Sequence, residues 1–313
     1  MRCSSGRSDA SGTVSARWGR VNKPPRQAAL IVNTKSRKGQ KAFREACRLL
    51  KEAGIELVIR KAVKRPSAFA GEVCKAVEAG VPMVIVGGGD GSVSSTVDHF
   101  VGKGSIFALL PLGTANSFAR SLDMPLDIEG AIRVIAEGKV KTVDLGMIDR
   151  DYFANCAAIG LSPLIAQTMP HGLKRIFGRP GYLAWAALQM ARFKPFTLTV
   201  TQGTQVETLD ALEVRIANGR FHGGAELVKT QVDAGEIVIQ AIDGKLRAKL
   251  LWSWGLALIG PDQVRGTVRE FRGREFRIET DPPLPISIDG EVRAKTPVEV
   301  RLARRAMLMA VPR

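Results

Sequence analysis

The sequence predicts a chain in two parts, a parallel α/β domain followed by an antiparallel β domain. Up to about residue 150, short apolar runs alternate with segments of helical spacing, which is the pattern of a parallel sheet with crossover helices. Beyond that point, short β-like segments are separated by turn dipeptides such as Asn218-Gly219 and Asp243-Gly244. The second part is therefore expected to be antiparallel, as a sandwich or as an open barrel.

The first part begins with Ala28–Asn33, an apolar run that ends in asparagine and is typical of a buried strand. Residues 40–53 follow, with Phe43, Cys47 and Leu50 at helical spacing. The other runs that predict buried strands are 55–60, 82–86, 106–110 and 141–147. The other segments that predict helices are 67–79, 91–101, one starting near residue 115, and 127–137.

The second part contains short segments with β character and two helical insertions. The β segments are 152–158, 196–202, 211–217, 236–242, 274–280, 284–288 and 297–302. The helices are expected at 181–193 and 245–259, and the second includes Leu250–Ile259, the most apolar stretch of the chain. We keep two interpretations of that stretch: a helix buried between domains, or an interfacial element on anionic lipid.

The composition favours anionic partners and a reducing compartment. The 313 residues include 46 Lys plus Arg against 30 Asp plus Glu, a formal net charge of +16. Such an excess favours nucleotide or acidic lipid as partner, whereas nucleic acid is not expected because no recognisable nucleic-acid module is present. The cysteines are scattered, and no apolar run reaches the roughly 20 residues that span a bilayer. The expected location is cytoplasmic, with peripheral contact at the inner membrane face left open.

Residues 1–26 differ from the rest in being rich in serine, glycine and arginine, with Asp9 as their one acidic residue. They cannot bury enough apolar area to offset the entropy lost on ordering, so a disordered basic arm is expected. A transit peptide, or a translation start placed too far upstream, would have the same composition. The three interpretations stay open.

The stretch most informative about function is the glycine-rich turn Gly87–Gly91, which follows the apolar run Met83–Val86. Glycine permits positive φ and lets a ligand approach the backbone closely. A strand that leads into such a turn and then into a helix can hold phosphate on backbone N–H groups. An ordinary strand-to-helix turn is the alternative, and the turn alone does not decide between them.

Two other turns follow strands of the same predicted sheet. Asn33–Gly39 is basic, and its Lys35, Arg37 or Lys38 could lie near a polyphosphate. Gly113 permits a tight turn, after which Thr114 or Asn116 can cap the next helix or contact a nucleotide. Because strands of a parallel sheet end at the same edge, these turns are expected near Gly87–Gly91.

A candidate base lies near the C-terminus, in Ile288-Asp289-Gly290-Glu291. Asp-Gly favours a two-residue hairpin turn, so a plain hairpin is one interpretation. The other is a carboxylate at the domain cleft, where Asp289 takes the proton of an alcohol as that oxygen attacks a γ-phosphoryl group. Glu291 could then orient Asp289 or bind a metal-associated water.

Three segments, in this order, carry a resemblance to a known family. Val86–Ser92, Pro111–Arg120 and Ile288–Glu291 resemble the motifs of the diacylglycerol kinase catalytic-domain family, which includes bacterial lipid kinases and sphingosine kinases. The resemblance extends over roughly residues 27–312. It implies a Rossmann-like parallel α/β domain and an antiparallel β-sandwich domain with the active site in the cleft between them. The implied boundaries are 27–148 for the ATP-binding domain, 149–305 for the lipid domain, and 306–313 for a strand returning to the first domain.

The resemblance also implies an activity and its site. The activity is ATP- and Mg²⁺-dependent phosphorylation of a lipid hydroxyl, with Asp289 as proton acceptor and Glu291 beside it. The candidates for binding ATP are Asn33, Gly88, Gly89, Asp90, Gly91, Ser92, Thr114 and Asn116. The candidates for binding the metal are Asp90 and Asp233. A lipid substrate and transient contact with an anionic membrane are the expected partners, and a homodimer is left open.

Several positions depart from the family pattern. Ser92 keeps a hydroxyl where threonine is common, but Ser95, Ser117 and Ala234 stand where the family commonly has carboxylates, and Ser94 stands where asparagine is common. Asp233, one position before Ala234, is an imperfect substitute. Two alternatives therefore remain: a catalytically silent nucleotide- or lipid-binding protein of this fold, and an NAD kinase, which shares the Gly-Gly-Asp-Gly turn.

Overall fold

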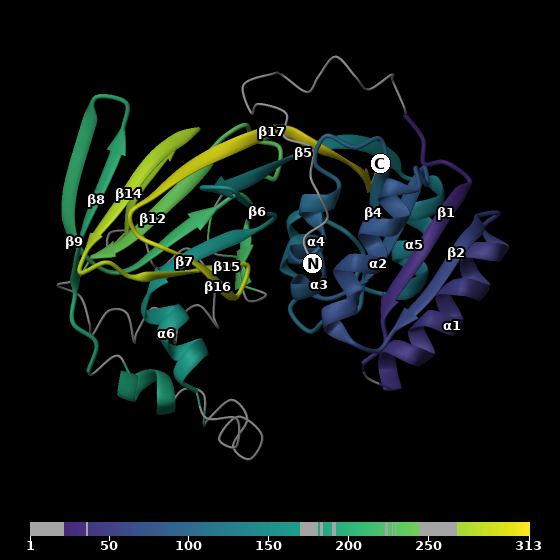
Figure 1. The fold of residues 1–313 in the computed structure, drawn as a ribbon, viewed down its shortest axis with the longest axis horizontal. Helices are drawn as coiled ribbons and strands as arrows, with labels where there is room; N and C mark the ends of the chain where they lie inside the picture. Colours follow the sequence, from purple (N-terminus) through teal and green to yellow (C-terminus); the bar gives the residue numbers. More distant parts are fainter. Residues whose placement is uncertain are drawn as a thin grey trace.

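The chain forms two domains joined by a pair of long strands (Figure 1). This computed structural model describes residues 22–35, 37–169, 181, 184–189, 192–222, 225–226, 228, 230–243 and 268–313. The predicted helix at 245–259 lies outside the described residues, as does nearly all of the predicted arm at 1–26. Residues 184–189 of the helix predicted at 181–193 are helical.

The first domain contains four parallel strands in the order β2-β1-β3-β4. They are β1 (Gln27–Asn33), β2 (Glu56–Val63), β3 (Met83–Gly88) and β4 (Ile106–Pro111). Every residue of β3 and β4 is buried, which explains why these strands are almost continuously apolar in sequence. The predicted fold class is confirmed in this domain, and its strands end at one edge of the sheet, where open α/β sheets bind ligands.

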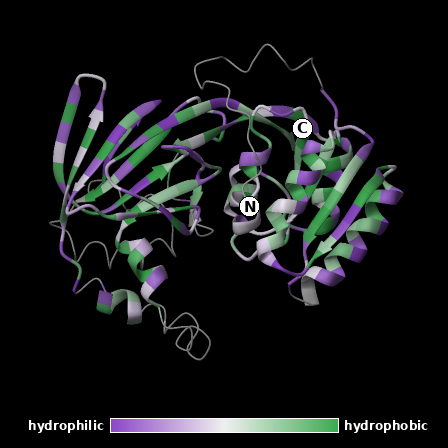
Figure 2. Ribbon diagram, in the orientation of Figure 1, coloured by the Kyte–Doolittle hydropathy of each residue, from purple (hydrophilic) through white to green (hydrophobic). Residues whose placement is uncertain are grey.

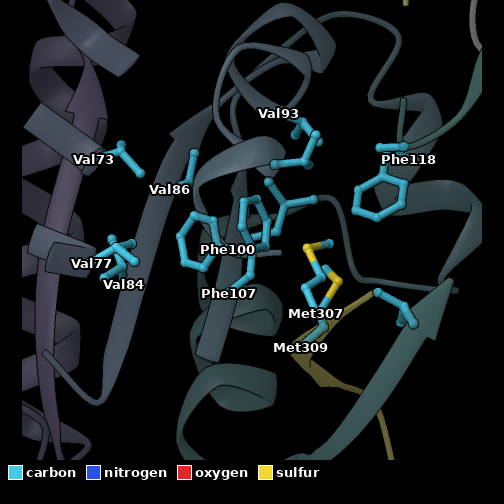
Figure 3. Close-up of a cluster of buried hydrophobic side chains, with 14 of the residues drawn as sticks. Val73, Val77, Val84, Val86, Val93, Phe100, Phe107, Phe118, Met307 and Met309 are labelled. Atoms are coloured by element: carbon cyan, nitrogen blue, oxygen red, sulfur yellow. The ribbon is translucent and has the colours of Figure 1, made fainter. Parts of the chain in front are cut away.

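Helices cover both faces of this sheet and make a separate hydrophobic core on each. On one face, α1 (Arg37–Glu52) and α5 (Ile128–Glu137) pack against side chains such as Leu30 and Ile85. On the other face, α2 (Pro66–Glu78) packs against Val84 and Val86, and Phe100 meets Phe107 edge to face with their ring centroids 4.9 Å apart (Figure 3). In Figure 2 the sheet strands are largely hydrophobic, whereas α1 alternates polar and apolar residues.

The helix predicted at 91–101 is wrong, because the chain forms two short pieces there. They are α3 (Asp90–Ser94) and the 3₁₀ turn η2 (Val97–His99). Thr96 Oγ1 donates back to the carbonyl of Ser92 at 2.8 Å, a side-chain bond that competes with the regular helix ladder. The helix expected near residue 115 is the equally short α4 (Ser117–Ser121).

Two antiparallel strands, β5 (Lys139–Ile148) and β17 (Val298–Val311), run through both domains (Figure 1). Met309 of β17 pairs with Phe107 in the first domain, whereas Val298–Arg301 pairs with a strand of the second. Between these regions Arg305 has a positive φ of 48°, and its N–H donates to the buried carboxylate of Asp144 at 2.7 Å. The domains are therefore joined by a hydrogen-bonded ribbon, which limits how freely they can move apart.

The second domain is an antiparallel sandwich around a main hydrophobic core, with two smaller clusters beside it. Its strands are β6 (Asp151–Phe153), β7 (Cys156–Gly160), β8 (Phe196–Gln202), β9 (Gln205–Ala217), β12 (Ile237–Asp243), β13 (Val268–Gly273), β14 (Glu275–Asp281), β15 (Pro285–Ile288) and β16 (Glu291–Lys295). The described part of this domain also includes the helix α6 (Leu161–Thr168) and the small hairpin of β10 (Phe221–His222) and β11 (Ala225–Glu226). The sequence pattern missed β13 and β16, whose exposed residues give weak alternation.

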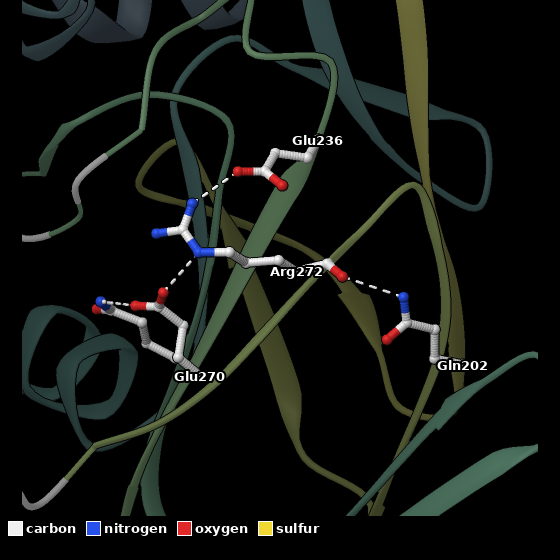
Figure 4. A network of polar contacts seen from close by, with 5 residues as sticks. Gln202, Glu236, Glu270 and Arg272 are labelled. Carbon is white, nitrogen blue, oxygen red and sulfur yellow. Dashed lines mark hydrogen bonds and ion pairs between the residues drawn. The ribbon is translucent and has the colours of Figure 1, made fainter.

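Arginines on this domain have acidic partners. Arg272 binds Glu236 at 2.6 Å and Glu270 at 2.7 Å, while its carbonyl accepts from Gln202 Nε2 at 3.0 Å (Figure 4). Arg269 pairs with Glu207 at 2.7 Å. The charge of these arginines is therefore matched within the sheet. None of the helices in the described part of the chain is long and apolar enough to cross a bilayer.

Two glycines allow the packing to be tested with one chemical change. Gly146 of β5 faces the ring of Phe153, and an added methyl would overlap that ring, whereas Gly71 in α2 has nothing within 4 Å of an added methyl. We expect Gly146→Ala to lower the free energy of unfolding by about 1–3 kcal/mol through overpacking. Gly71→Ala should raise it by about 1 kcal/mol through helix propensity.

Urea denaturation of both variants measures these changes. A Gly146→Ala protein as stable as the parent would contradict the packing of β5 against Phe153.

Candidate active site

A pocket of about 260 Å³ opens where the two domains meet. Its lining residues are Asp90, Val93, Ser117, Phe118, Ala154, Asn155, Asp289 and Gly290. The first four come from the α/β domain and the last four from the sandwich domain. The fold therefore brings Asp90 and Asp289, two of the predicted site residues, to one pocket.

Asp90 is the first residue of α3 and follows the glycines that end β3. Its Oδ1 accepts a hydrogen bond from the backbone N–H of Phe118 at 3.2 Å, which ties the glycine-rich turn to the start of α4. Among the described residues, its Oδ2 has no hydrogen-bond donor. Asp90 thus has one carboxylate oxygen that supports the fold and one that is free to bind a ligand.

The turns after β3 and β4 are in direct contact through glycines. A methyl on Gly113 would lie 2.5 Å from the Cα of Gly89 and 2.7 Å from Asn116 Oδ1, so only glycine fits there. Leu112 N–H donates to the carbonyl of Gly88 at 2.9 Å across the same contact. The predicted proximity of these two turns is present in the structure.

Asn116 does not cap the helix that follows it, contrary to one of the two predicted roles. Its Oδ1 accepts from Gly113 N–H at 2.9 Å, and its Nδ2 donates to the Gly113 carbonyl at 3.0 Å. The residue adopts a positive φ of 47°, so its side chain folds back over the turn and cannot reach the N–H groups of α4. Asn116 shapes the turn, whereas Thr114 is exposed.

The end of β1 joins the same site. Asn33 Nδ2 donates to Ser92 Oγ at 3.5 Å, and Asn33 Oδ1 accepts from Lys35 N–H at 3.2 Å. Ser92 is buried, and its side chain fills the space that a Cβ on Gly88 would need. Asn33, Gly88 and Ser92 therefore lie together; the side chains of Arg37 and Lys38 lie outside the described residues.

Asp289 occupies the turn between β15 and β16. Asp289 and Gly290 both have positive φ, at 46° and 95°, as the Asp-Gly turn predicts. Three backbone N–H groups converge on its carboxylate: Ala154 donates to Oδ2 at 3.0 Å, while Asn155 and Cys156 donate to Oδ1 at 3.2 and 3.1 Å. Both interpretations of residues 288–291 therefore hold: they form a hairpin turn, and that turn places a carboxylate at the pocket. Because Oδ2 accepts only one of these bonds, it retains a lone pair for a ligand hydroxyl.

The surroundings of Asp289 make it a stronger base than an ordinary aspartate. It opens onto the pocket, but protein encloses it on the other sides, and this burial raises the pKa of the carboxyl to about 6. The negative charge of Asp90 acts in the same direction, whereas the three backbone N–H groups act against it. A carboxylate with this pKa is ionised at neutral pH and still accepts a proton readily.

Asp98 on η2 was not singled out by its sequence pattern. Desolvation of its carboxyl, then the charges of Asp151 and Asp289, raise its pKa to about 6, while Arg293 acts in the opposite direction. Asp98 does not line the interdomain pocket. Only the tertiary contact between η2 and β6 reveals this carboxylate, because no motif surrounds it.

Glu291 and Asp233 do not join the pocket lining. Glu291 is exposed and binds Arg293 at 2.8 Å, and Asp233 forms an ion pair with Lys141 of β5. Within the described ranges, no three His, Cys, Asp or Glu side chains are grouped to hold a metal. Magnesium, however, keeps several waters and needs only one or two carboxylates when phosphates are present. Asp90, with its free Oδ2, fits that requirement. Asp233 does not line the pocket that contains Asp90.

Comparison with known proteins gives matches along most of the chain. Residues 27–148 match the family model of the diacylglycerol kinase catalytic domain, and residues 158–311 match that of the YegS C-terminal NAD kinase beta sandwich-like domain. A relative from Klebsiella pneumoniae named "Probable lipid kinase YegS-like" is 28% identical over 288 residues, 90% of this chain and 95% of that protein. A "Probable lipid kinase YegS" from Salmonella typhimurium is 33% identical over 202 residues, 63% of this chain and 67% of that protein.

Solved structures agree with the fold. A diacylglycerol kinase structure from Bacillus anthracis strain Sterne has a TM-score of 0.72 at 21% identity, covering 91% of this chain and 97% of that one. A second structure from the same organism gives a TM-score of 0.76 at 23% identity, covering 95% and 98%. At these sequence identities the similarity shows a shared fold and no more than that.

Gly91 offers a test of where phosphate binds. A methyl added there would have no protein atom within 4 Å, so Gly91→Ala should leave the free energy of unfolding unchanged or slightly higher. If phosphates approach this turn, the methyl occupies their space, and the Kd for ATP should rise about tenfold or more. Calorimetric titration with ATP measures the change, with Gly71→Ala as matched control. Unchanged affinity in Gly91→Ala would place the phosphates elsewhere.

Proposed function

The chain belongs to the diacylglycerol kinase catalytic-domain family, and we propose that it transfers the γ-phosphoryl group of ATP to a hydroxyl of a diacylglycerol-like or related lipid. One observation supports this most strongly. A single pocket is lined by the Asp90 carboxylate of one domain and the Asp289 carboxylate of the other. Family membership supports a lipid kinase, and this geometry supports a phosphotransferase that binds nucleotide on one side and activates an alcohol on the other.

Asp289 acts as the general base in this proposal. The acceptor hydroxyl donates its hydrogen bond to Oδ2 and loses its proton to that oxygen as it attacks the γ-phosphorus. The bond from that phosphorus to the β,γ-bridging oxygen breaks, and ADP leaves. The backbone N–H groups of Ala154, Asn155 and Cys156 hold the carboxylate in one orientation throughout. Positioning of this kind supplies much of the rate in phosphoryl transfer, since the transition state needs little covalent help from the protein.

The turns of the first domain bind ATP. Backbone N–H groups of residues 89–91 receive the phosphates, with Asn33 and Thr114 beside them, since the N–H of Ser92 already donates to the Gly89 carbonyl at 2.9 Å. Asn116 contributes by holding the neighbouring turn in shape, as its bonds to Gly113 indicate. Asp90 is the residue that would hold Mg²⁺, through its Oδ2 and together with the phosphates. When bound, the ion supplies neutralisation of charge on the phosphate oxygens.

The departures from the family pattern leave the proposed base and the nucleotide turn in place. Ser117 lines the pocket, so a hydroxyl stands where the family commonly has a carboxylate. Ser95 Oγ donates to the Ser92 carbonyl at 3.2 Å and takes part in the local structure of α3. The pocket is thus less negative than the family pattern implies, which reduces repulsion of ATP and reduces the number of candidate metal ligands.

The lipid acceptor implies contact with a membrane surface. We infer transient binding to anionic lipid at the cytoplasmic face, supported by the formal net charge of +16. Because Arg269 and Arg272 have acidic partners, they contribute little to such binding. A homodimer stays a prediction from the sequence.

A transfer assay tests the proposed function. Purified protein is incubated with γ-labelled ATP, Mg²⁺ and vesicles that contain a panel of lipid alcohols, and label in the lipid extract is the expected result. A parallel reaction with NAD tests for NADP formation, the product of an NAD kinase. Binding of ATP without label in any lipid or in NADP would contradict the proposal and leave the catalytically silent alternative.

Replacing the proposed base gives the first prediction for the enzyme. Asp289→Asn removes the proton acceptor, so the rate should fall by about 100-fold or more. The ATP-binding turns lie in the other domain, so the Kd for ATP should stay within about twofold of the parent. Transfer assays and titration calorimetry measure the two quantities. Retention of full turnover by this variant would remove Asp289 from the role of base.

The pKa of Asp289 predicts how kcat/KM for phosphoryl transfer depends on pH. Above about pH 6 the carboxylate is ionised and can accept a proton, whereas below that value it is protonated. We expect kcat/KM to fall by about tenfold for each pH unit below this point and to level off above it. The comparison is made at pH values where circular dichroism shows the protein folded. A flat profile from pH 5 to about 7.5 would argue against a base with this pKa.

A further inference from the structure

Asn155, in the turn between β6 and β7, lies directly beside Asp289 and uses all its polar groups. It is 6% exposed and lines the interdomain pocket. Its N–H donates to Asp289 Oδ1 at 3.2 Å, and its carbonyl accepts from the N–H groups of Asn218 at 2.9 Å and Gly219 at 3.0 Å. The backbone of Asn155 therefore connects the proposed base to the 218–221 segment.

The side chain of Asn155 crosses to the other domain. Its Oδ1 accepts from Ser121 Oγ at 3.2 Å, and its Nδ2 donates to the carbonyl of Phe221. Ser121 belongs to α4 of the first domain, is 4% exposed, and accepts from Phe221 N–H at 3.3 Å. Asn155, Ser121 and Phe221 thus form a closed set of hydrogen bonds, which we term the interdomain bridge.

Neighbouring residues pack tightly against the interdomain bridge and hold the 218–221 segment in place. A methyl on Gly219 would lie 2.8 Å from Ser121 Oγ and would overlap Asn155 Oδ1. Asn218 Nδ2 donates to the carbonyls of Asp144 and Ala154 at 3.0 Å each, which fixes the same segment to β5. Arg220 pairs with Asp123, just beyond α4. Several independent contacts therefore hold Asn155 against α4.

The same helix, α4, holds the other pocket carboxylate. Phe118 N–H at its start donates to Asp90 Oδ1, and Ser121 at its end binds Asn155. A continuous series of hydrogen bonds thus runs from Asp90 through α4 and Asn155 to Asp289. The ribbon of β5 and β17 joins the two domains, and this series adds a second connection, which links the two carboxylates of the pocket.

We propose that Asn155 is a positioning residue that fixes the Asp289 carboxylate relative to the nucleotide-binding domain, with Ser121 as its anchor there. The inference rests on the proposed function, since it takes Asp289 as the base. A base must lie within about 2.6–3.2 Å of the proton that it abstracts, and an error of about 1 Å in position costs up to about 100-fold in rate. Loss of the interdomain bridge should therefore affect the chemical step more than nucleotide binding.

The experiment compares Ser121→Ala, Asn155→Ala and the double variant with Ser105→Ala. Ser105 is a matched control, because it is also 4% exposed and donates one hydrogen bond, to the Val81 carbonyl at 2.7 Å. It lies just before β4, at the opposite edge of the sheet from the pocket. Ser105→Ala should lower stability as Ser121→Ala does and leave kcat unchanged.

The expected result is a fall in kcat of about 10- to 100-fold in each bridge variant, with the KM for ATP within about twofold of the parent. The double variant should be no slower than the slower single variant, because both changes remove the same contact. Additive losses, or an equal loss in Ser105→Ala, would overturn the proposal.

Hydrogen exchange reports on the interdomain bridge without requiring activity. The amides of Ala154, Asn155 and Cys156, which donate to Asp289, should exchange faster in Ser121→Ala than in Ser105→Ala or the parent. Unchanged exchange in Ser121→Ala would overturn the proposal even if the parent is an active kinase. If the parent labels no lipid but Ser121→Ala speeds this exchange, the proposed function fails while the link between Asn155 and Asp289 stands.

Discussion

Three backbone N–H groups converge on the carboxylate of Asp289, and the candidate site depends on that arrangement. Asp289 and Ala154 are 135 residues apart in sequence, so only the finished fold can bring them together. The pairing of β15 with β7 places the 288–291 turn beside residues 154–156, and the turn itself needs two consecutive residues with positive φ. Within the described part of the chain, the β-sandwich thus holds this charged group at a domain boundary with backbone N–H groups as its hydrogen-bond donors.

The balance of two opposing effects sets the chemistry of this group. Hydrogen bonds from backbone N–H groups favour the ionised carboxylate, whereas burial and the charge of Asp90 favour the protonated form. Burial prevails, so the pKa of Asp289 lies at about 6. The neighbouring thiol of Cys156 experiences the same burial, which raises its pKa to about 12 and keeps it protonated and unreactive. Of these two neighbours, Asp289 is the group that can exchange a proton near neutral pH.

The two-domain fold could be predicted from sequence because its strongest patterns are local. The runs at 28–33, 82–86 and 106–110 are strands buried on both faces, and the Asp-Gly turn at 289–290 has the conformation that its residues favour. The continuity of β17 could not be predicted, because residues 301–305, where it crosses between the domains, are exposed or half-buried and interrupt the apolar pattern. Thr96 broke a predicted helix through a side-chain bond that periodicity does not register.

Within the site, sequence identified Asp90 and Asp289 because each lies in a turn with recognisable glycines. Asn155 lies in no motif, and its importance follows only from contacts with residues such as Ser121 and Phe221 that are distant in the chain. Helix capping is one of the two roles that the sequence predicts for Asn116, but its positive φ directs the amide back to Gly113; nucleotide binding stays a prediction. Glu291 adjoins the Asp-Gly turn, yet strand alternation directs it to Arg293 at the surface.

The central claim is that nucleotide and acceptor meet between Asp90 and Asp289. A crystal structure with Mg²⁺ and a non-hydrolysable ATP analogue tests it most directly. We predict the terminal phosphate in the pocket lined by both carboxylates, with the ion on Asp90 and with Asp289 Oδ2 on the side of the phosphorus from which an acceptor would attack. A terminal phosphate bound outside this pocket, or one that leaves Asp289 out of reach of any acceptor, would contradict the account.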